Sequence, residues 1–446
     1  MVVAEVVVAA TKSSPTSTIL SHLTLAALAL PGLLPQSVLA GRVEESYNAD
    51  FQYGHYSESG QRMSVDIFEG ASSLPIGKQM TGTLNLVRDV ITGASPMYNR
   101  REANGKLVQV LSGASRCGAS ICDERNAISS GLTYFWDATA LSLGGGYSSE
   151  NDYVSRYFNT ALSMDFNKKL TTLNLSASVA FDENNPRYLN NDCGEYCHKT
   201  SQQYLLGISQ VIDKESLLQS NMSFAYHQGY LSDPYKLATF YTPDASYVVD
   251  PNQPGQYVQV DPVNPDNIKL GTEQNSQPIL ESAANDRRPR DKFQWAWLTQ
   301  YVRHFGQFND AALHVDYRFT LDNWGIRSHT QEISWHQPLV DGWQLIPRFR
   351  YYSQTQAEFY NAVFTGQASD YTYYSGDYRL AGFGALSGGL KLTKTFTALK
   401  AVHDLKLQIG AEYYDHQAGY QLEGNTSSPF ADFSYYLLMA SFNAKF

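Results

Sequence analysis

Four cysteines in two close pairs are the first residues whose types and spacing could do chemistry. They lie in CGASIC, which holds Cys117 and Cys122, and in CGEYCH, which holds Cys193 and Cys197 before His198. An even number of closely spaced cysteines in an exported chain favours disulfides. We predict the pairs Cys117–Cys122 and Cys193–Cys197, with pairing between the two segments as the open alternative. Haem attachment and a metal cluster are disfavoured, and no cofactor is expected.

A second group combines acids, bases and a hydroxyl in one stretch. If a hairpin turns at Trp324, His314 faces Ser334 and Asp316 faces Glu332. A further turn near Val340 would set Glu332 beside Arg348 and Thr330 beside Arg350. The predicted charge row on this polar face comprises His314, Asp316, Arg318, Glu332, Arg348 and Arg350.

This row has two interpretations. Charges inside a pore set a field across it and select solutes. Alternatively, the row is a structural ion network that plugs or stiffens an interior. A nucleophilic set of His314, Asp316 and Ser334 is disfavoured, because strand rise puts the first two ~6.5–7 Å apart and no glycine-rich nucleophile turn is present. We expect no enzymatic activity.

A third feature is the basic run ANDRRPRDK at the end of a long segment, 230–291. It holds Arg287, Arg288, Arg290 and Lys292. The segment could fold inward as a constriction or cap a mouth, and its basic end could meet the phosphates of lipopolysaccharide. The plainer interpretation is a surface loop with a solvated basic rim.

The elements that must position these residues are strands. In KKLTTLNLSASVAF, Leu173, Leu175 and Val179 alternate with Asn174 and Ser178. Such alternation predicts strands with different surroundings on their two faces. Most segments run 10 to 15 residues, the length that tilted strands need to cross a bilayer. Sixteen such segments lie near 46–57, 61–70, 78–91, 127–136, 140–148, 153–165, 170–181, 201–212, 217–229, 292–305, 310–322, 327–337, 343–357, 379–395, 404–417 and 433–446.

The connections between these segments sort by length. Taken alternately, one set contains only short turns, and the other holds all the long loops: 92–126, 182–200, 230–291, 358–378 and 418–432. Short periplasmic turns and long outer loops are typical of an outer-membrane barrel. The pattern therefore predicts an antiparallel up-and-down transmembrane β-barrel of about 16 strands (14–18 allowed), with the even number bringing both ends to the periplasmic side.

The final segment, FSYYLLMASFNAKF, has one apolar face and one mostly polar face. In hydrocarbon no backbone N–H or C=O can go unpaired, so the last strand must pair with the first and close the sheet. A terminal aromatic suits the interface girdle and resembles the signal read by the barrel-insertion machinery. The residues predicted to face lipid are Tyr436, Leu438, Phe442 and Phe446.

Composition and the N-terminus indicate export. An apolar run over 19–34 precedes SVLA, with small residues before Gly41, which predicts a signal peptide over 1–40 and a barrel over 41–446. The net charge of −10 leaves no basic stripe for phosphates, so a nucleic-acid partner is not expected. A TonB-gated transporter is disfavoured, because too little chain precedes the first strand for a plug domain.

Several phrases resemble a family of bacterial outer-membrane proteins known only as a domain of unknown function. They cover nearly the whole predicted mature chain: RDVITGASP, GGYSSENDYVSR, QGYLSDPYK, LDNWGIRSHT, RFRYYSQTQAEFY, YRLAGFGALSGGLKL and ADFSYYLL. The resemblance implies an exported barrel of a Gram-negative bacterium, and it implies neither an activity nor site residues.

We therefore expect a monomeric or trimeric barrel in the bacterial outer membrane, surrounded by lipid and lipopolysaccharide. The leading function is porin-like passage of small solutes. The alternative is a non-transporting scaffold that receives a periplasmic or surface partner.

Overall fold

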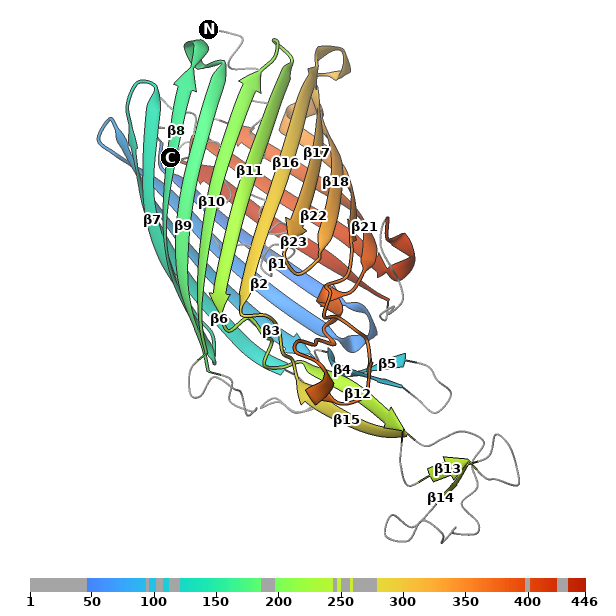
Figure 1. The fold of residues 1–446 in the computed structure, drawn as a ribbon. Helices are drawn as coiled ribbons and strands as arrows, with labels where there is room; N and C mark the ends of the chain where they lie inside the picture. Colours follow the sequence, from blue (N-terminus) through green and yellow to red (C-terminus); the bar gives the residue numbers. More distant parts are fainter. Residues whose placement is uncertain are drawn as a thin grey trace.

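The computed structural model describes residues 46–93, 96–101, 107–111, 121–185, 197–243, 247–249, 257–259, 279–397, 402–422 and 432–446. The dominant element is one closed antiparallel barrel of sixteen strands (Figure 1). Its strands are β1 (Asn48–Glu58), β2 (Met63–Ile76), β3 (Met80–Gly93), β6 (Ile121–Phe135), β7 (Thr139–Ser149), β8 (Tyr153–Phe166), β9 (Thr171–Asn184), β10 (Cys197–Val211), β11 (Ser216–Gly229), β16 (Asp291–Phe305), β17 (Ala311–Asp322), β18 (Arg327–Pro338), β19 (Trp343–Gln354), β21 (Phe383–Thr397), β22 (Asp404–Gln417) and β23 (Phe433–Lys445).

The predicted fold class is confirmed, and each of the sixteen predicted segments overlaps one barrel strand. The alternation of apolar and polar residues arises because the two faces of each strand have different surroundings. In β9, Leu175 and Phe181 are exposed on the outer face, whereas Ser178 is buried on the inner face. Exposed large apolar side chains recur on nearly every barrel strand, which is the surface that hydrocarbon requires.

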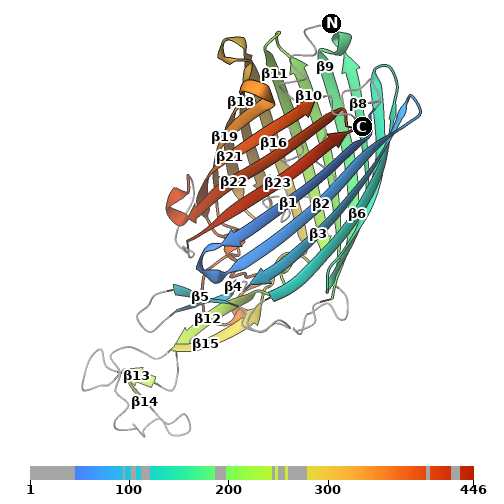
Figure 2. The ribbon, with the colours of Figure 1, turned by 180° about the vertical axis from the view of Figure 1, so that it is seen from behind.

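The two ends of the barrel differ. We call the end with the short connections the turn end and the opposite end the loop end. At the turn end, tight turns use residues with positive φ, such as Lys168 in η3 (Asn167–Lys169), Asn309 after η4 (Gly306–Phe308) and Asp341 in η5 (Val340–Gly342). The C-terminus, Phe446, also lies there (Figure 2).

The loop end carries additional secondary structure below the barrel (Figures 1 and 2). Three small sheets form there: the hairpin β4 (Pro96–Arg101) and β5 (Leu107–Leu111), the pair β13 (Tyr247–Val249) and β14 (Tyr257–Gln259), and the three-stranded sheet of β12 (Leu237–Pro243), β15 (Ile279–Asn285) and β20 (Phe364–Thr365). Short 3-10 turns complete the loops: η2 (Ser59–Gln61), η6 (Ala368–Asp370), η7 (Tyr378–Leu380) and η8 (Ala418–Tyr420).

The barrel closes where its first and last strands meet. β1 pairs with β23 along its whole length, from Asn48 opposite Lys445 to Glu58 opposite Tyr435. The seam therefore leaves neither strand with an unpaired edge, as a bilayer demands. In the part of the chain that the structure describes, no helix is long and apolar enough to cross a membrane.

Candidate functional site: the barrel interior and its loop-end cap

The predicted charge row lies on the inner wall, on the neighbouring strands β17, β18 and β19. His314 pairs in register with Ser334, and Asp316 with Glu332, as the turn at Trp324 requires. The positions alternate with outward residues such as Val315, Ile333 and Phe349, which are exposed. Alternation thus brings the six residues of the row to one face of the sheet.

The register between β18 and β19 differs from the prediction by two residues. Glu332 lies opposite Arg350, Ser334 opposite Arg348 and Thr330 opposite Tyr352. The expected neighbours Glu332–Arg348 and Thr330–Arg350 are therefore wrong as direct partners. The cause is the turn, which is centred on Asp341 rather than Val340, since Asp341 and Gly342 adopt positive φ there. Moving a hairpin centre by one residue moves every cross-strand partner by two.

The centre of the inner wall is nevertheless an ion cluster around Arg348. Its Nη2 lies 2.8 Å from Oε2 of Glu332, and its Nη1 lies 3.0 Å from Oε2 of Glu412 on β22. The Glu332 contact runs diagonally across the β18–β19 pair, since a long side chain can reach the diagonal neighbour. Asp316 accepts a hydrogen bond of 3.0 Å from Nε2 of Gln300 on β16. Charges of both signs therefore line this wall.

The hydroxyl of Ser334 lies beside His336, whereas the disfavoured nucleophilic set would pair it with His314 as its base. Its Oγ lies 3.3 Å from Nε2 of His336 on the same strand. The His336 ring stacks on His314, with centroids 4.2 Å apart. The hydroxyl is thus placed beside a stacked imidazole pair.

Three long loops meet over the loop end of the barrel. Asn99, from the hairpin between β3 and β6, donates to the carbonyls of Ala362 and Gly376 in the loop between β19 and β21. The carbonyl of Asn99 in turn accepts a 2.6 Å hydrogen bond from Oγ1 of Thr239 in β12, between β11 and β16. These loops leave the barrel at widely separated strands, and we call the region where they contact one another, 96–101, 230–243, 284–292 and 355–381, the cap.

The cap is also held by buried ion pairs. Arg288 lies 2.6 Å from Asp286 and 2.8 Å from Asp377, and both carboxylates are fully buried. Arg379 contacts both Asp377 and Asp233. Burial by itself would raise the pKa of Asp377, but the adjacent cations Arg379, Arg288 and Lys236 outweigh it and hold that pKa well below its usual value.

Aromatic packing completes the cap. Trp324, Tyr360 and Leu380 form one buried cluster, and Phe240, Phe364 and Tyr374 form another. Arg62, from the turn between β1 and β2, lies over the rings of Tyr378 and Phe433, 5.3 Å and 4.6 Å from their centroids. The cap therefore contacts the barrel on the side of the seam as well as beside β16.

The predicted basic run splits into two parts. Arg288 is committed to the ion pairs above, and the Nζ of Lys292 lies 3.0 Å from Asp322 and over the ring of Trp324. Arg287 and Arg290 are exposed. Half of the run is therefore internal structure, and half faces solvent at the loop end.

The other predicted residues have plain positions. On β23, Tyr436, Leu438 and Phe442 are exposed on the outer face, as is Phe446 after it, while Leu437 is fully buried on the inner face.

Cys197 is buried at the start of β10, and no described cysteine is free. Cys122 lies in β6, whereas Cys117, Cys193 and the predicted signal peptide 1–40 lie outside the described residues. The two cysteine pairings stay predictions.

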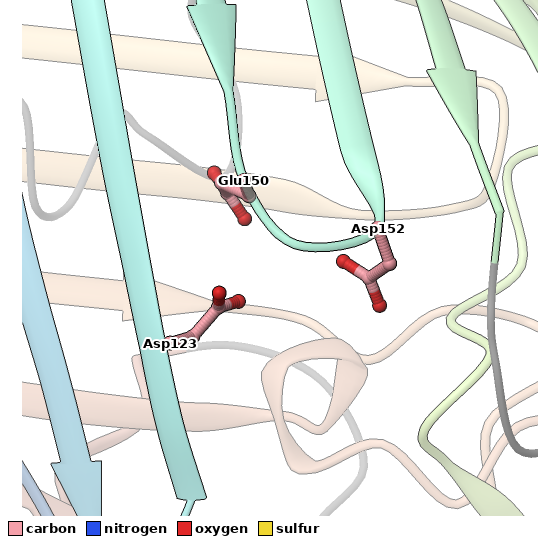
Figure 3. A group of neighbouring side chains, drawn as sticks. All are labelled: Asp123, Glu150 and Asp152. Carbon is pink, nitrogen blue, oxygen red and sulfur yellow. The ribbon is translucent and has the colours of Figure 1, made fainter.

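One acidic group lies at the loop end of the wall (Figure 3). Asp123 of β6 approaches Glu150 and Asp152 of the connection between β7 and β8, with carboxylate oxygens within 4.8 Å of one another. Asn151 donates to Asp123 over 2.7 Å. Burial, reinforced by the charge of Asp123, raises the pKa of Glu150 to about 7. No second feature of the described residues points to a ligand here, so we assign none.

Sequence reasoning missed two parts of this site, Glu412 in the ion cluster and the ion pairs of the cap. Glu412 was recoverable, because alternation along β22 places it on the polar face with Gln408 and Lys406. Its closeness to Arg348 requires knowing that β21 contributes glycine at the intervening position, Gly389. The cap pairs Asp286, Arg288, Asp377 and Arg379 lie in irregular loops, where no periodicity signals their meeting.

The closed sixteen-strand barrel with an apolar outer face and a charged inner wall defines an integral β-barrel protein of the bacterial outer membrane. Residues 20–437 match the model of the family described as "Protein of unknown function (DUF3570)". The chain belongs to this family, which confirms the resemblance seen in its phrases. No curated protein matches the chain.

Solved structures with a similar fold are remote in sequence. The siderophore receptor PirA from Acinetobacter baumannii shares 10 % identity at a TM-score of 0.39, over 84 % of this chain and 53 % of the receptor. This chain thus spans about half of the receptor's length. A bacterial polysaccharide outer-membrane secretin shares 7 % (TM-score 0.44, 91 % and 99 % covered), and OpdK of Pseudomonas aeruginosa, solved with vanillate, shares 9 % (0.38, 91 % and 100 %).

Proposed function

We propose that the barrel is a passive, non-enzymatic channel for small polar solutes across the outer membrane. The observation that carries the proposal is the inner wall around Arg348, where one cation lies between the carboxylates of Glu332 and Glu412. A sixteen-strand barrel is wide enough for an aqueous path. Fixed charges of both signs on one wall would set a field across that path and select among solutes.

The second candidate is a non-transporting scaffold, and a specific observation favours it. The cap joins three long loops through Asn99 and through the buried pairs of Asp377. If the cap seals the mouth, the barrel would serve to hold loop or periplasmic surfaces for a partner.

Conductance separates the two candidates. Purified full-length protein in planar bilayers should give discrete ion-conducting steps if the channel proposal holds. Persistently silent bilayers would reject a constitutive channel. The variant Asp377→Asn, which weakens the cap, then identifies the reason for silent bilayers. If wild type is silent and the variant conducts, the cap closes an existing pore. If both are silent, the scaffold is favoured.

A further inference from the structure

The loop end of the barrel has a cavity of about 390 Å³ that the channel proposal does not use. Three separate segments line it: 230–234 after β11, 285–290 before β16, and 373–374 in the loop between β19 and β21. Cavities of this size hold small organic ligands, of the order of one or two sugar rings.

The cavity is a built feature, because hydrogen bonds join its three walls. Arg287 and Tyr374 exchange backbone hydrogen bonds of 3.0 Å and 2.8 Å. The N–H of Arg288 donates to Oγ of Ser232 over 3.0 Å, and the N–H of Asp233 donates to Asp286 over 2.7 Å. Two of the lining residues, Asp286 and Arg288, form a buried ion pair, and Arg288 also pairs with the buried Asp377.

The charge of the lining is positive. Three arginines and one aspartate line the cavity, which leaves a net charge of +2. Arg288 is neutralised by its own carboxylate partners. Arg287 and Arg290 are exposed and make no ion pair within the described residues. Exposed guanidiniums are the groups best suited to bidentate contact with phosphate oxygens.

The rest of the lining suits a polyhydroxylated ring. Tyr230 and Tyr373 contribute aromatic surface and phenolic hydroxyls, and Tyr373 is 42 % exposed. Ser232 and Asn285 add further polar atoms. Aromatic faces beside hydrogen-bonding groups accept amphipathic rings, which have one apolar and one polar side.

We propose that this cavity binds a phosphorylated sugar, with Arg287 and Arg290 holding the phosphate and Tyr373 packing against the ring. Two sources can present that chemistry at the loop end: a soluble sugar phosphate, or the phosphorylated sugars of lipopolysaccharide in the same leaflet. Binding to the cavity does not depend on conduction, so the inference stands or falls separately from the channel proposal.

The test measures binding to the detergent-purified full-length chain by isothermal titration calorimetry. Glucose 6-phosphate, glucose and inorganic phosphate serve as soluble probes, and intact and dephosphorylated lipopolysaccharide as lipid probes. We expect saturable binding of a phosphorylated probe and weaker binding of its phosphate-free counterpart. Binding of glucose 6-phosphate identifies the soluble source, and binding of intact lipopolysaccharide alone identifies the lipid source.

Matched variants assign the effect to the cavity. The double variant Arg287→Gln/Arg290→Gln should weaken binding of the phosphorylated probe by about tenfold or more, since two charge-assisted contacts are lost. The control variant Lys78→Gln/Lys214→Gln also removes two positive charges, but from exposed turns at the turn end, and it should leave binding unchanged. Tyr373→Ala should weaken a sugar phosphate more than inorganic phosphate.

Three results would overturn the inference. One is the absence of saturable binding by every phosphorylated probe. The second is equal affinity for the phosphorylated and phosphate-free probes. The third is an equal loss in the double variant and its turn-end control. Because all five substituted residues are exposed, the thermal unfolding of the variants should match wild type, which separates lost binding from lost folding.

Discussion

Arg348 is the residue on which the inner wall depends. It is largely buried between Glu332 and Glu412, so its removal would leave two carboxylates facing each other with no cation between them. Breaking a buried ion pair from one side typically costs about 3–5 kcal/mol, because the remaining charge loses its compensation. The same substitution makes the wall more negative.

We expect Arg348→Gln to lower thermal stability by several degrees and, in a conducting barrel, to raise the permeability of cations relative to anions. Thermal melts in detergent and reversal potentials in a salt gradient measure the two effects. Arg88→Gln is the matched control, because Arg88 pairs with Glu124 on the outer face and both are about half exposed. Equal shifts in both variants would contradict a role for the inner wall.

The cysteines make a second prediction at the residue scale. Disulfides Cys117–Cys122 and Cys193–Cys197 would each close a small loop between one long connection and the first residues of the strand that follows it. Peptide mapping by mass spectrometry, with and without reductant, should show each pair within its own segment. Free thiols in the purified protein would contradict both pairs, and cross-linked peptides from the two segments would replace them with the alternative pairing.

At the scale of elements, the cap depends on Asp377. This carboxylate is fully buried and accepts from Arg288 and Arg379. We expect Asp377→Asn to loosen the cap by about 3–5 kcal/mol, since two guanidiniums lose their shared partner. Hydrogen exchange of the amides in 357–381 should rise, while exchange in β6 to β9 stays as in wild type. Unchanged exchange in 357–381 would show that the ion pairs do not hold the cap.

The same carboxylate gives the cap a pH dependence of known sign. The pKa of Asp377 is lower in the folded protein than its usual value of 3.8. Its contribution is therefore complete above the usual pKa and is lost as the pH falls toward the folded one. The part of the cap protection that depends on Asp377 should be constant from about pH 8 to 5 and decline below about pH 4. In Asp377→Asn that decline should be smaller, and an identical decline would assign it to other carboxylates.

The strands were predictable because lipid on one face favours apolar side chains and the polar interior on the other favours polar ones, so successive residues alternate. Leu175 and Ser178 show this alternation in β9, and the loop lengths show which end is which. The register of β18 on β19 was missed by two residues, although the Asp-Gly step at Asp341 is a strong hairpin signal. The cap was not predictable, since partners such as Asn99 and Thr239 are 140 positions apart in irregular or isolated segments.

At the scale of the whole molecule, the outer face is mostly apolar, with exposed large apolar side chains on every barrel strand. Leu438 lies near the middle of β23 and is 47 % exposed. An arginine on the lipid face near the bilayer midplane costs about 2–4 kcal/mol. We therefore expect Leu438→Arg to reduce folding into lipid vesicles, measured by far-UV circular dichroism and protease resistance. Leu422→Arg, at an exposed position beyond β22, should fold like wild type, and equal folding of both variants would contradict the lipid contact.

The seam between β1 and β23 has a consequence for biogenesis. Neighbouring strands elsewhere in the barrel come from adjacent or nearby stretches of chain, but this pair joins stretches nearly four hundred residues apart. A chain that lacks β23 could not close the barrel, because β1 and β22 would each keep an unpaired edge that can pair with strands of other molecules. Closure of the barrel therefore requires the last strand, and the long sequence separation of the two partners makes this pairing slow to form.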